Sequence, residues 1–189
     1  MLFFLIKNKP LKILIIINGI FSLGAYMFPP VFALFVKELG GGVLDAGTIW
    51  ATYAIIAGLL VSLIIRYGDN IKEKEYLVAA GYAFRILAWT GYIFVSALWQ
   101  LYALQILLAI GESLGAAAFN AIYSEHLEKN KYVGQWGAWN SSNTVIGGLA
   151  ALSGGLIVFH FGFQVLFVVM TALAIISFIL LMIQPRQLL

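Results

Sequence analysis

The chain has 189 residues, of which 62% are hydrophobic and 10% are charged, and its formal net charge is +3. Because soluble domains carry about 25% charged residues, this composition predicts an integral membrane protein. The basic residues are too scattered to indicate a nucleic-acid partner, and the absence of cysteine excludes disulfides, thiolate metal sites and cysteine nucleophiles.

Six long apolar segments follow one another along the chain and predict an all-α membrane fold. Each has about 20 to 27 residues, enough for a helix to cross a hydrocarbon core roughly 30 Å thick. Short connections join them, so we expect one six-helix transmembrane domain over residues 1–189. Pro29 and Pro30 interrupt the first segment and predict a kink there. The segments are residues 11–36, 46–65, 76–96, 98–124, 134–159 and 163–184.

The turn between the second and third segments, RYGDNIKEKEY, holds six charged side chains. If six helices cross the membrane, both termini lie on the same side as this turn. Only Lys37 then lies on the opposite side, and Arg85 falls within the third segment. This bias predicts cytoplasmic termini and a multi-pass protein of the plasma or inner cell membrane. The other nine basic residues share the side of the termini: Lys7, Lys9, Lys12, Arg66, Lys72, Lys74, Lys129, Lys131 and Arg186.

Arg85 and Glu112 are the two charged side chains that we expect near the middle of the membrane. A charge at that depth costs about 2.5–3.5 kcal/mol on insertion scales, so each suggests a function. They lie on adjacent antiparallel helices and can form an ion pair. The pair either locks the two helices together or makes Glu112 a proton carrier or substrate ligand, and a third interpretation directs Arg85 along the lipid surface.

Polar side chains recur on one face of three predicted helices. The fourth segment carries Gln105, Glu112 and Phe119 at intervals of seven, which is nearly two helical turns. These faces either form hydrogen bonds between helices or line a common cavity. The other two sets are Asn18, Ser22 and Tyr26 on the first segment, and Asn140, Ser141, Ser142, Asn143 and Thr144 on the fifth.

Two patterns have a structural explanation. The sequence GESLG matches the serine-hydrolase motif G-x-S-x-G, but it lies within a predicted helix and its G-x-x-x-G spacing favours close helix packing. Gly147, Ala151 and Gly155 form a similar row of small residues.

His126 and His160 fall on opposite membrane faces, so the sequence predicts no metal site, and nothing in it indicates a cofactor.

Several stretches resemble one half of a major facilitator superfamily transporter. They are LGGGVLDAGTIWATYAIIAGLL, the charged turn, LYALQILLAIGESLGAAAFNAIYSEHLEKNKYVGQWG and IGGLAALSGGLIVFHFGFQVLF. In the turn, Asp69 matches the aspartate of the family's G-x-x-x-D-x-x-G-R-K pattern and Lys74 its last basic residue. Ile65, Lys72 and Glu73 depart from it. The resemblance implies that the turn, with Asp69, Lys72 and Lys74, acts as a gate, whereas the alternative is a turn whose charge only fixes topology.

The resemblance also implies a central cavity between the first, fourth and fifth helices. We expect Asn18, Tyr26, Gln105, Glu112 and their neighbours Arg85, Asn140 and Asn143 to bind substrate or couple its movement. Gln105 stands where many members carry an arginine, which argues against coupling through an arginine there. Sugars, amphiphilic drugs and cations all suit such a mixed cavity.

The family normally has twelve spans in two parallel six-helix halves, whereas this chain resembles one half. We therefore favour a half-sized secondary transporter of a small solute over a fragment of a longer one. It would act as a parallel homodimer with alternating access and proton coupling, in contact with membrane lipid. The alternatives are a membrane scaffold with a packed interior and an intramembrane enzyme, for which the sequence offers no catalytic constellation.

Overall fold

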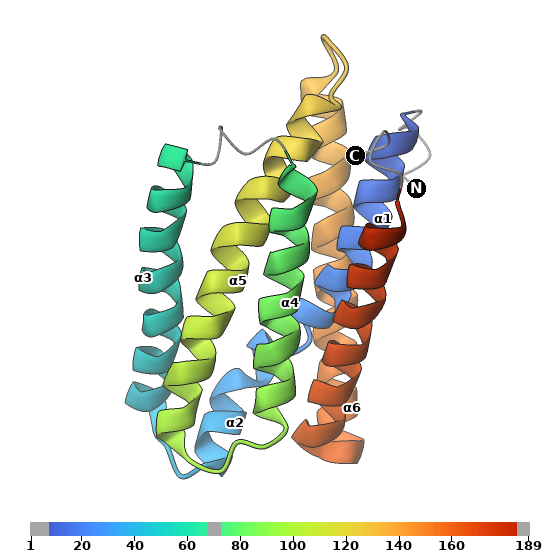
Figure 1. Cartoon of the computed structure of the whole chain (residues 1–189). Helices are drawn as coiled ribbons and strands as arrows, with labels where there is room; N and C mark the ends of the chain where they lie inside the picture. Colours follow the sequence, from blue (N-terminus) through green and yellow to red (C-terminus); the bar gives the residue numbers. More distant parts are fainter. Residues whose placement is uncertain (1–7, 68–72, 185–189) are drawn as a thin grey trace.

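The computed structural model describes residues 8–67 and 73–184, and every regular element in these ranges is helical (Figure 1). By length and composition, four stretches of the described chain can cross a membrane: Lys9–Glu38, Val43–Ile64, Leu98–Glu125 and Tyr132–Ile183. The elements are α1 (Lys9–Ala25), the 3-10 turn η2 (Pro29–Val31), α2 (Phe32–Glu38), α3 (Val43–Tyr67), α4 (Lys74–Tyr92), α5 (Leu98–Glu125) and α6 (Tyr132–Ile183).

The first apolar stretch is one interrupted helix. After α1 the chain passes through η2, which begins at Pro29, and then continues as α2. Neither proline has a backbone N–H to continue the α-helical ladder, which explains the break. The predicted kink is confirmed.

The element α6 consists of two helical arms that run in opposite directions. Gly162 separates them with φ 81° and ψ 176°, a conformation that a residue with a Cβ rarely adopts. Figure 1 shows the first arm (residues 132–161) descending beside α1 and the second (residues 163–183) returning upward. The break lies within the short HFGF connection that separated the two predicted segments.

The helix α4 has 19 residues and is not among the four stretches that satisfy the length and hydropathy criteria. Lys74 and Glu75 begin the helix and Arg85 lies in its second half, so its mean hydropathy is lower than that of its neighbours. It nevertheless packs inside the bundle, where Val78, Tyr82 and Trp89 are buried.

Glycines allow α4 and α5 to pack with their backbones in contact. A Cβ on Gly81 would lie 2.6 Å from the Cα of Gly115 and 2.7 Å from the carbonyl oxygen of Gly111. The G-x-x-x-G sequence is therefore a packing motif within α5, as predicted, and its serine is no nucleophile elbow. Ser113 Oγ donates to the carbonyl of Ile110 in its own helix.

A second close contact joins α1 to the first arm of α6. A Cβ on Gly154 would overlap the carbonyl oxygen of Met27, while Gly155 has no atom within 4 Å of its Cβ direction. The predicted row Gly147, Ala151 and Gly155 was therefore wrong at its last member. The reason is the break after α1, which brings the Met27 backbone against the preceding residue.

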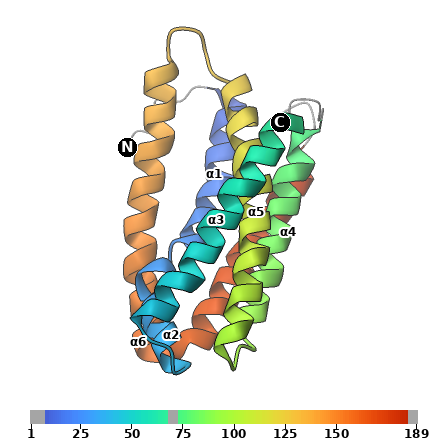
Figure 2. The same cartoon turned by 90° about the vertical axis from the view of Figure 1, so that its left-hand side faces the viewer.

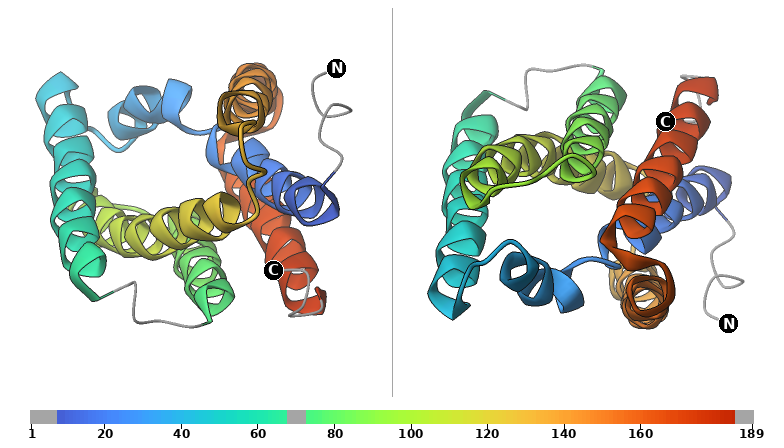
Figure 3. Two further views of the ribbon diagram at one scale, coloured as in Figure 1. Left: turned by 90° about the horizontal axis from the view of Figure 1, so that it is seen from above. Right: turned by 90° about the horizontal axis from the view of Figure 1, so that it is seen from below.

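The helices form a bundle with two unlike sides. Figure 3 shows α2 and the first arm of α6 along one side, α4 with the second arm of α6 along the other, and α3 at one end. Figure 2, turned by 90°, shows α3 in front of α5, at an edge of the bundle. The core between the two sides is rich in aromatic rings; Phe28, for example, contacts Tyr92 and Phe167 at centroid distances of 5.2 and 5.0 Å.

Candidate functional site

A half-open cavity of about 400 Å³ lies between the helices of the bundle. Its lining residues come from α1, η2, α2, α3, α4, α5 and both arms of α6, so nearly every element contributes to it. The volume falls in the range of about 300–1,000 Å³ that is typical of small-molecule sites. The polar residues other than tyrosine that line it are Asn18, Ser22, Arg85, Gln105, Glu112, Asn120 and Asn143.

An ion pair between Arg85 Nη2 and Glu112 Oε2 lies on the wall of this cavity. Arg85 follows Gly81 by about one turn of α4, and Glu112 follows Gly111 directly on α5. The close backbone contact of these glycines brings the two charged side chains together. A Cβ on Gly111 would lie only 2.9 Å from Arg85 Cγ, so the glycine also makes room for the arginine. Arg85 therefore faces the bundle interior and not the lipid surface.

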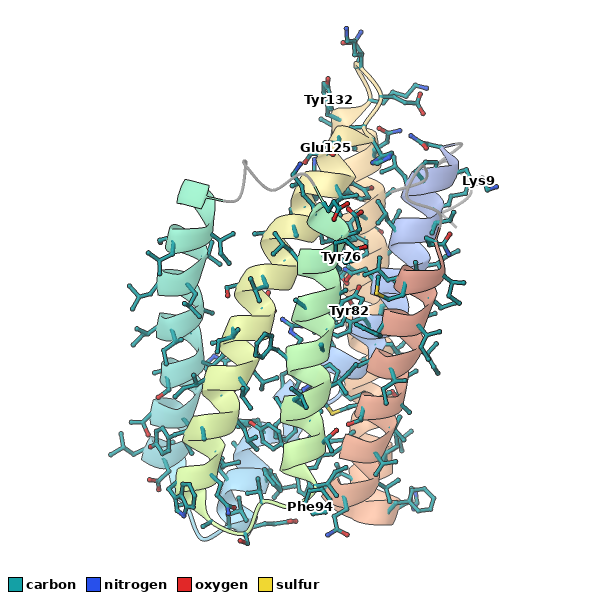
Figure 4. All side chains as sticks on the ribbon, in the orientation of Figure 1. Lys9, Tyr76, Tyr82, Phe94, Glu125 and Tyr132 are labelled. Atoms are coloured by element: carbon teal, nitrogen blue, oxygen red, sulfur yellow. The ribbon has the colours of Figure 1, made fainter. Side chains whose placement is uncertain are left out.

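Aromatic stacking and a hydrogen bond tie this ion pair to α1. The guanidinium carbon of Arg85 lies 5.0 Å from the ring centroid of Phe21, a cation–π distance. Phe21 stacks in turn on Tyr82 at 4.2 Å, and the Tyr82 hydroxyl donates to Asn18 Oδ1 at 2.9 Å. Figure 4 shows Tyr82 near mid-height in the bundle, between Glu125 and Tyr132 toward one end and Phe94 at the other. The charged pair therefore lies deep inside the bundle.

A second polar contact joins α1 to α6 across the cavity. Asn143 Nδ2 donates to the Tyr26 hydroxyl at 2.8 Å, and the Tyr26 ring lies against Gly147, 3.5 Å from its Cβ direction. The other amide atom, Asn143 Oδ1, is buried and has no hydrogen-bond partner among the described residues. The Tyr92 hydroxyl is in the same situation, and both residues line the cavity. The site thus retains unused hydrogen-bonding capacity.

The structure brings six of the seven predicted substrate or coupling residues to this cavity: Asn18, Tyr26, Arg85, Gln105, Glu112 and Asn143. Asn140 is exposed and is not among the lining residues. Trp139 and Asn143, four residues apart, occupy the cavity face of the first arm of α6, and Asn140 lies on the neighbouring face. Its carbonyl accepts a hydrogen bond from the Thr144 hydroxyl.

The predicted gating turn is described only in part. Asp69 and Lys72 lie outside the described residues. Lys74 Nζ forms an ion pair with Glu125 Oε1 at 2.7 Å, which joins the start of α4 to the end of α5. Glu125 is 55% exposed, so this pair contributes little to stability, about 0.2–1 kcal/mol by analogy with other exposed pairs.

Sequence analysis anticipated Tyr26 and Phe119 but missed most of the aromatic part of the site. Phe21, Trp50, Tyr53, Tyr82 and Trp89 all line the cavity. Tyr82 precedes Arg85 by three residues and so shares its helix face, which is a signal the sequence contained. The position of Phe21 depends on how α1 is rotated against α4, and no local pattern reveals that rotation.

Comparison with known proteins gives one consistent family. The sequence matches the Major Facilitator Superfamily over residues 14–188. It is 28% identical to the multidrug resistance protein MdtG of Escherichia fergusonii over 184 residues, which cover 93% of this chain and 44% of that protein. It is 22% identical to the uncharacterized MFS-type transporter YitZ of Bacillus subtilis, over 81% of this chain and 93% of YitZ.

The fold has a close counterpart among solved structures. The in meso crystal structure of the POT family transporter PepTSo superposes with a TM-score of 0.78 at 15% sequence identity. The match covers 94% of this chain and 37% of that one. The chain thus spans less than half the length of MdtG and of PepTSo, but nearly the whole length of YitZ.

Proposed function

Because the chain belongs to the major facilitator superfamily, we propose that it carries out secondary-active transport of a small solute across a cell membrane. The cavity of about 400 Å³ around the buried Arg85–Glu112 pair is the observation that supports this proposal most directly. A scaffold needs a packed interior, whereas this bundle holds a half-open cavity of ligand size. Charges are kept at such depth chiefly where they serve a substrate or ion pathway.

The proposed topology has six spans with both termini in the cytoplasm. The first span combines α1, η2 and α2; α3, α4 and α5 supply the next three, and the two arms of α6 the last two. Lys9, Glu125 and Tyr132 lie near one end of the bundle and Phe94 near the other (Figure 4). The basic residues Lys12, Lys129 and Lys131 belong to the first of these ends, which the positive-inside rule assigns to the cytoplasm.

The second half of the transporter is supplied, in this proposal, by another copy of the chain. Two copies in parallel would reproduce the arrangement of the two halves of a full-length family member. The match covers 93% of YitZ, so a family relative of about this length supports the proposal. Exposed apolar side chains on two helices are candidates for the contact surface: Ile55, Leu59 and Leu63 on α3, and Leu149, Leu152 and Leu156 on α6.

Alternating access would follow from a rocking of the two copies about the cavity, with Glu112 as the group that takes up and releases a proton. An arginine cannot do so, because guanidinium stays protonated in proteins. The proposed gate at Asp69, Lys72 and Lys74 stays a prediction.

Proton-driven uptake into vesicles tests the transport proposal. The protein is reconstituted into liposomes with a pH gradient, and uptake is measured over a panel of neutral, cationic and anionic solutes. We expect at least one solute to accumulate with the wild-type protein. The Glu112→Gln protein should not accumulate that solute but should still exchange it. No uptake of any solute by folded dimers would favour a scaffold instead, and full accumulation by folded Glu112→Gln protein would exclude the proton carrier.

A cross-linking experiment tests the assembly. Leu59→Cys and Leu152→Cys lie at exposed apolar positions of α3 and α6, and Phe94→Cys is exposed at one end of the bundle. Oxidation in membranes should trap dimers through one or both of the first two positions and none through the third. Equal cross-linking at all three positions would indicate random collision and contradict the proposed dimer.

A further inference from the structure

Both members of the buried ion pair line the cavity, and the carboxylate is the more exposed of the two. The Glu112 side chain is 33% exposed, whereas that of Arg85 is 14% exposed. Arg85 is enclosed between the Phe21 ring and the backbone of Gly111. A ligand that enters the cavity therefore meets a negative group first, with its counter-charge behind it.

The walls around Glu112 are aromatic to an unusual degree. Eleven of the cavity residues are Phe, Tyr or Trp, although these types make up only 15% of the chain. Trp50, Trp89 and Trp139 belong to three different helices, so rings surround the space on several sides. Aromatic faces carry negative electrostatic potential and attract cations, and the same faces repel anions. The walls and the carboxylate thus favour the same sign of ligand charge.

One buried acceptor on the cavity wall lacks a hydrogen-bond donor in the described part of the chain. Asn143 Oδ1 can only accept a hydrogen bond, and it has no partner among the described residues. A buried acceptor without a partner is destabilising, and a ligand with an N–H group would satisfy it. This requirement is independent of the charge argument, because it comes from a different helix and a neutral side chain.

We propose that the cavity binds a hydrophobic amine in its ammonium form. The positive charge is attracted to Glu112 and the aromatic faces, the N–H groups are donors of the kind that Asn143 Oδ1 lacks, and the apolar body fills the ring-lined space. A sugar would bring no positive charge to Glu112, and a carboxylate ligand would be repelled by it. The inference deepens the proposed transport function, on which its biological use depends, by naming the class of substrate.

Three ligands that share one aromatic body and differ in their head group test this assignment. They are biphenyl-4-ylmethylammonium, the neutral biphenyl-4-ylmethanol and the anionic biphenyl-4-ylacetate. Binding to the full chain in phosphatidylcholine nanodiscs is measured by titration calorimetry, with empty nanodiscs as the blank for partition into lipid. We expect the ammonium to bind about tenfold or more tightly than the alcohol, and the acetate to bind most weakly. Equal affinities, or tighter binding of the acetate, would overturn the proposal.

Two variants with the same change of charge localise the effect. Glu112→Gln should reduce ammonium affinity about tenfold and leave alcohol affinity nearly unchanged. Glu38→Gln removes one carboxylate from an exposed position at the end of α2, outside the cavity, and should change neither. If Glu112→Gln does not fold, the double variant Arg85→Met with Glu112→Gln removes the unpaired cation as well, and the same selective loss is expected. Unchanged ammonium affinity in whichever variant folds refutes the site.

The experiments distinguish a failure of the proposed transport function from a failure of the proposed amine site. If the ammonium binds with the expected selectivity but does not cross vesicles, the site assignment stands and the proposed transport function is wrong. If a neutral or anionic solute is accumulated while the ammonium does not bind, transport stands and the amine assignment is wrong.

Discussion

The helices α1 and α3 have nearly the same mean hydropathy but very different surroundings. In the stretch that begins with α1, 56% of the most apolar 18-residue window is buried within the protein, compared with 11% for α3. The helix α1 packs against α6, and its side chains Asn18 and Phe21 contact Tyr82 of α4, whereas α3 packs mainly against α5. Apolar sequence therefore identifies both as membrane helices but does not distinguish an interior helix from a peripheral one.

The difference lies in the kind of contact that each helix makes. Just after α1, the Met27 backbone contacts Gly154. Within α1, the Phe21 ring stacks on Tyr82 and Asn18 accepts a hydrogen bond from the Tyr82 hydroxyl. On α3, Leu59 and Leu63 are more than half exposed, and Gly58 has no atom within 4 Å of its Cβ direction. Close packing fixes α1 within the chain, while the exposed face of α3 is free to meet lipid or a second copy.

The largest effect should come from breaking the charge pair that packs against α1. Glu112→Gln leaves Arg85 buried beneath Phe21 without its carboxylate, and removal of one partner of a buried pair typically costs about 3–5 kcal/mol. We expect a correspondingly lower free energy of unfolding in detergent. The double variant Arg85→Met with Glu112→Gln should recover most of the loss. Failure of the second change to restore any stability would mean that the pair does not hold the bundle together.

A matched pair of glycine substitutions tests packing directly. Leucine at Gly154 would meet the Met27 carbonyl beside α1, and overpacking of this kind costs about 1–3 kcal/mol. At Gly58 of α3 a Cβ would have no atom within 4 Å, and leucine gains helix propensity, so stability should be unchanged or slightly higher. The free energy of unfolding of both variants in detergent gives the comparison. An equal loss at the two positions would show that α3 is as closely packed as α1.

Hydropathy and proline placement allowed much of the bundle to be anticipated. The predicted segment 46–65 corresponds to α3, and the HFGF connection contains the break at Gly162. The interval of seven residues on α5 also predicted a common face, since Gln105, Glu112 and Phe119 all line the cavity. These features depend only on local sequence, because length, backbone chemistry and helical periodicity determine them.

Other features depend on how helices are rotated against one another, and the sequence did not reveal them. Five consecutive polar residues open the predicted fifth helix, and a helix cannot direct all of them to one side. Asn143 therefore reaches the cavity while Asn140 does not. The stacking of Phe21 on Tyr82 and the contact of Gly154 with Met27 each require the relative position of two helices distant in sequence.

The smallest predicted effect compares two tyrosine hydroxyls that each join a pair of helices. Tyr82 donates to Asn18 of α1 at 2.9 Å in a partly buried position, and Tyr102 of α5 lies 2.9 Å from the Thr48 hydroxyl of α3 in an exposed one. Interhelical hydrogen bonds in membranes contribute about 0.6 kcal/mol on average and up to about 1.7 kcal/mol.

We expect Tyr82→Phe to cost close to that average, because Asn18 then loses its donor within the protein. Tyr102→Phe should cost less, since an exposed Thr48 hydroxyl also bonds to the Asp45 carbonyl of its own helix. The free energy of unfolding of the two variants, measured in one detergent, gives the comparison. A larger loss for Tyr102→Phe would mean that α3 is held to the bundle more firmly than its exposure indicates. The contrast between α1 and α3 would then reflect apolar packing alone and would not extend to polar contacts.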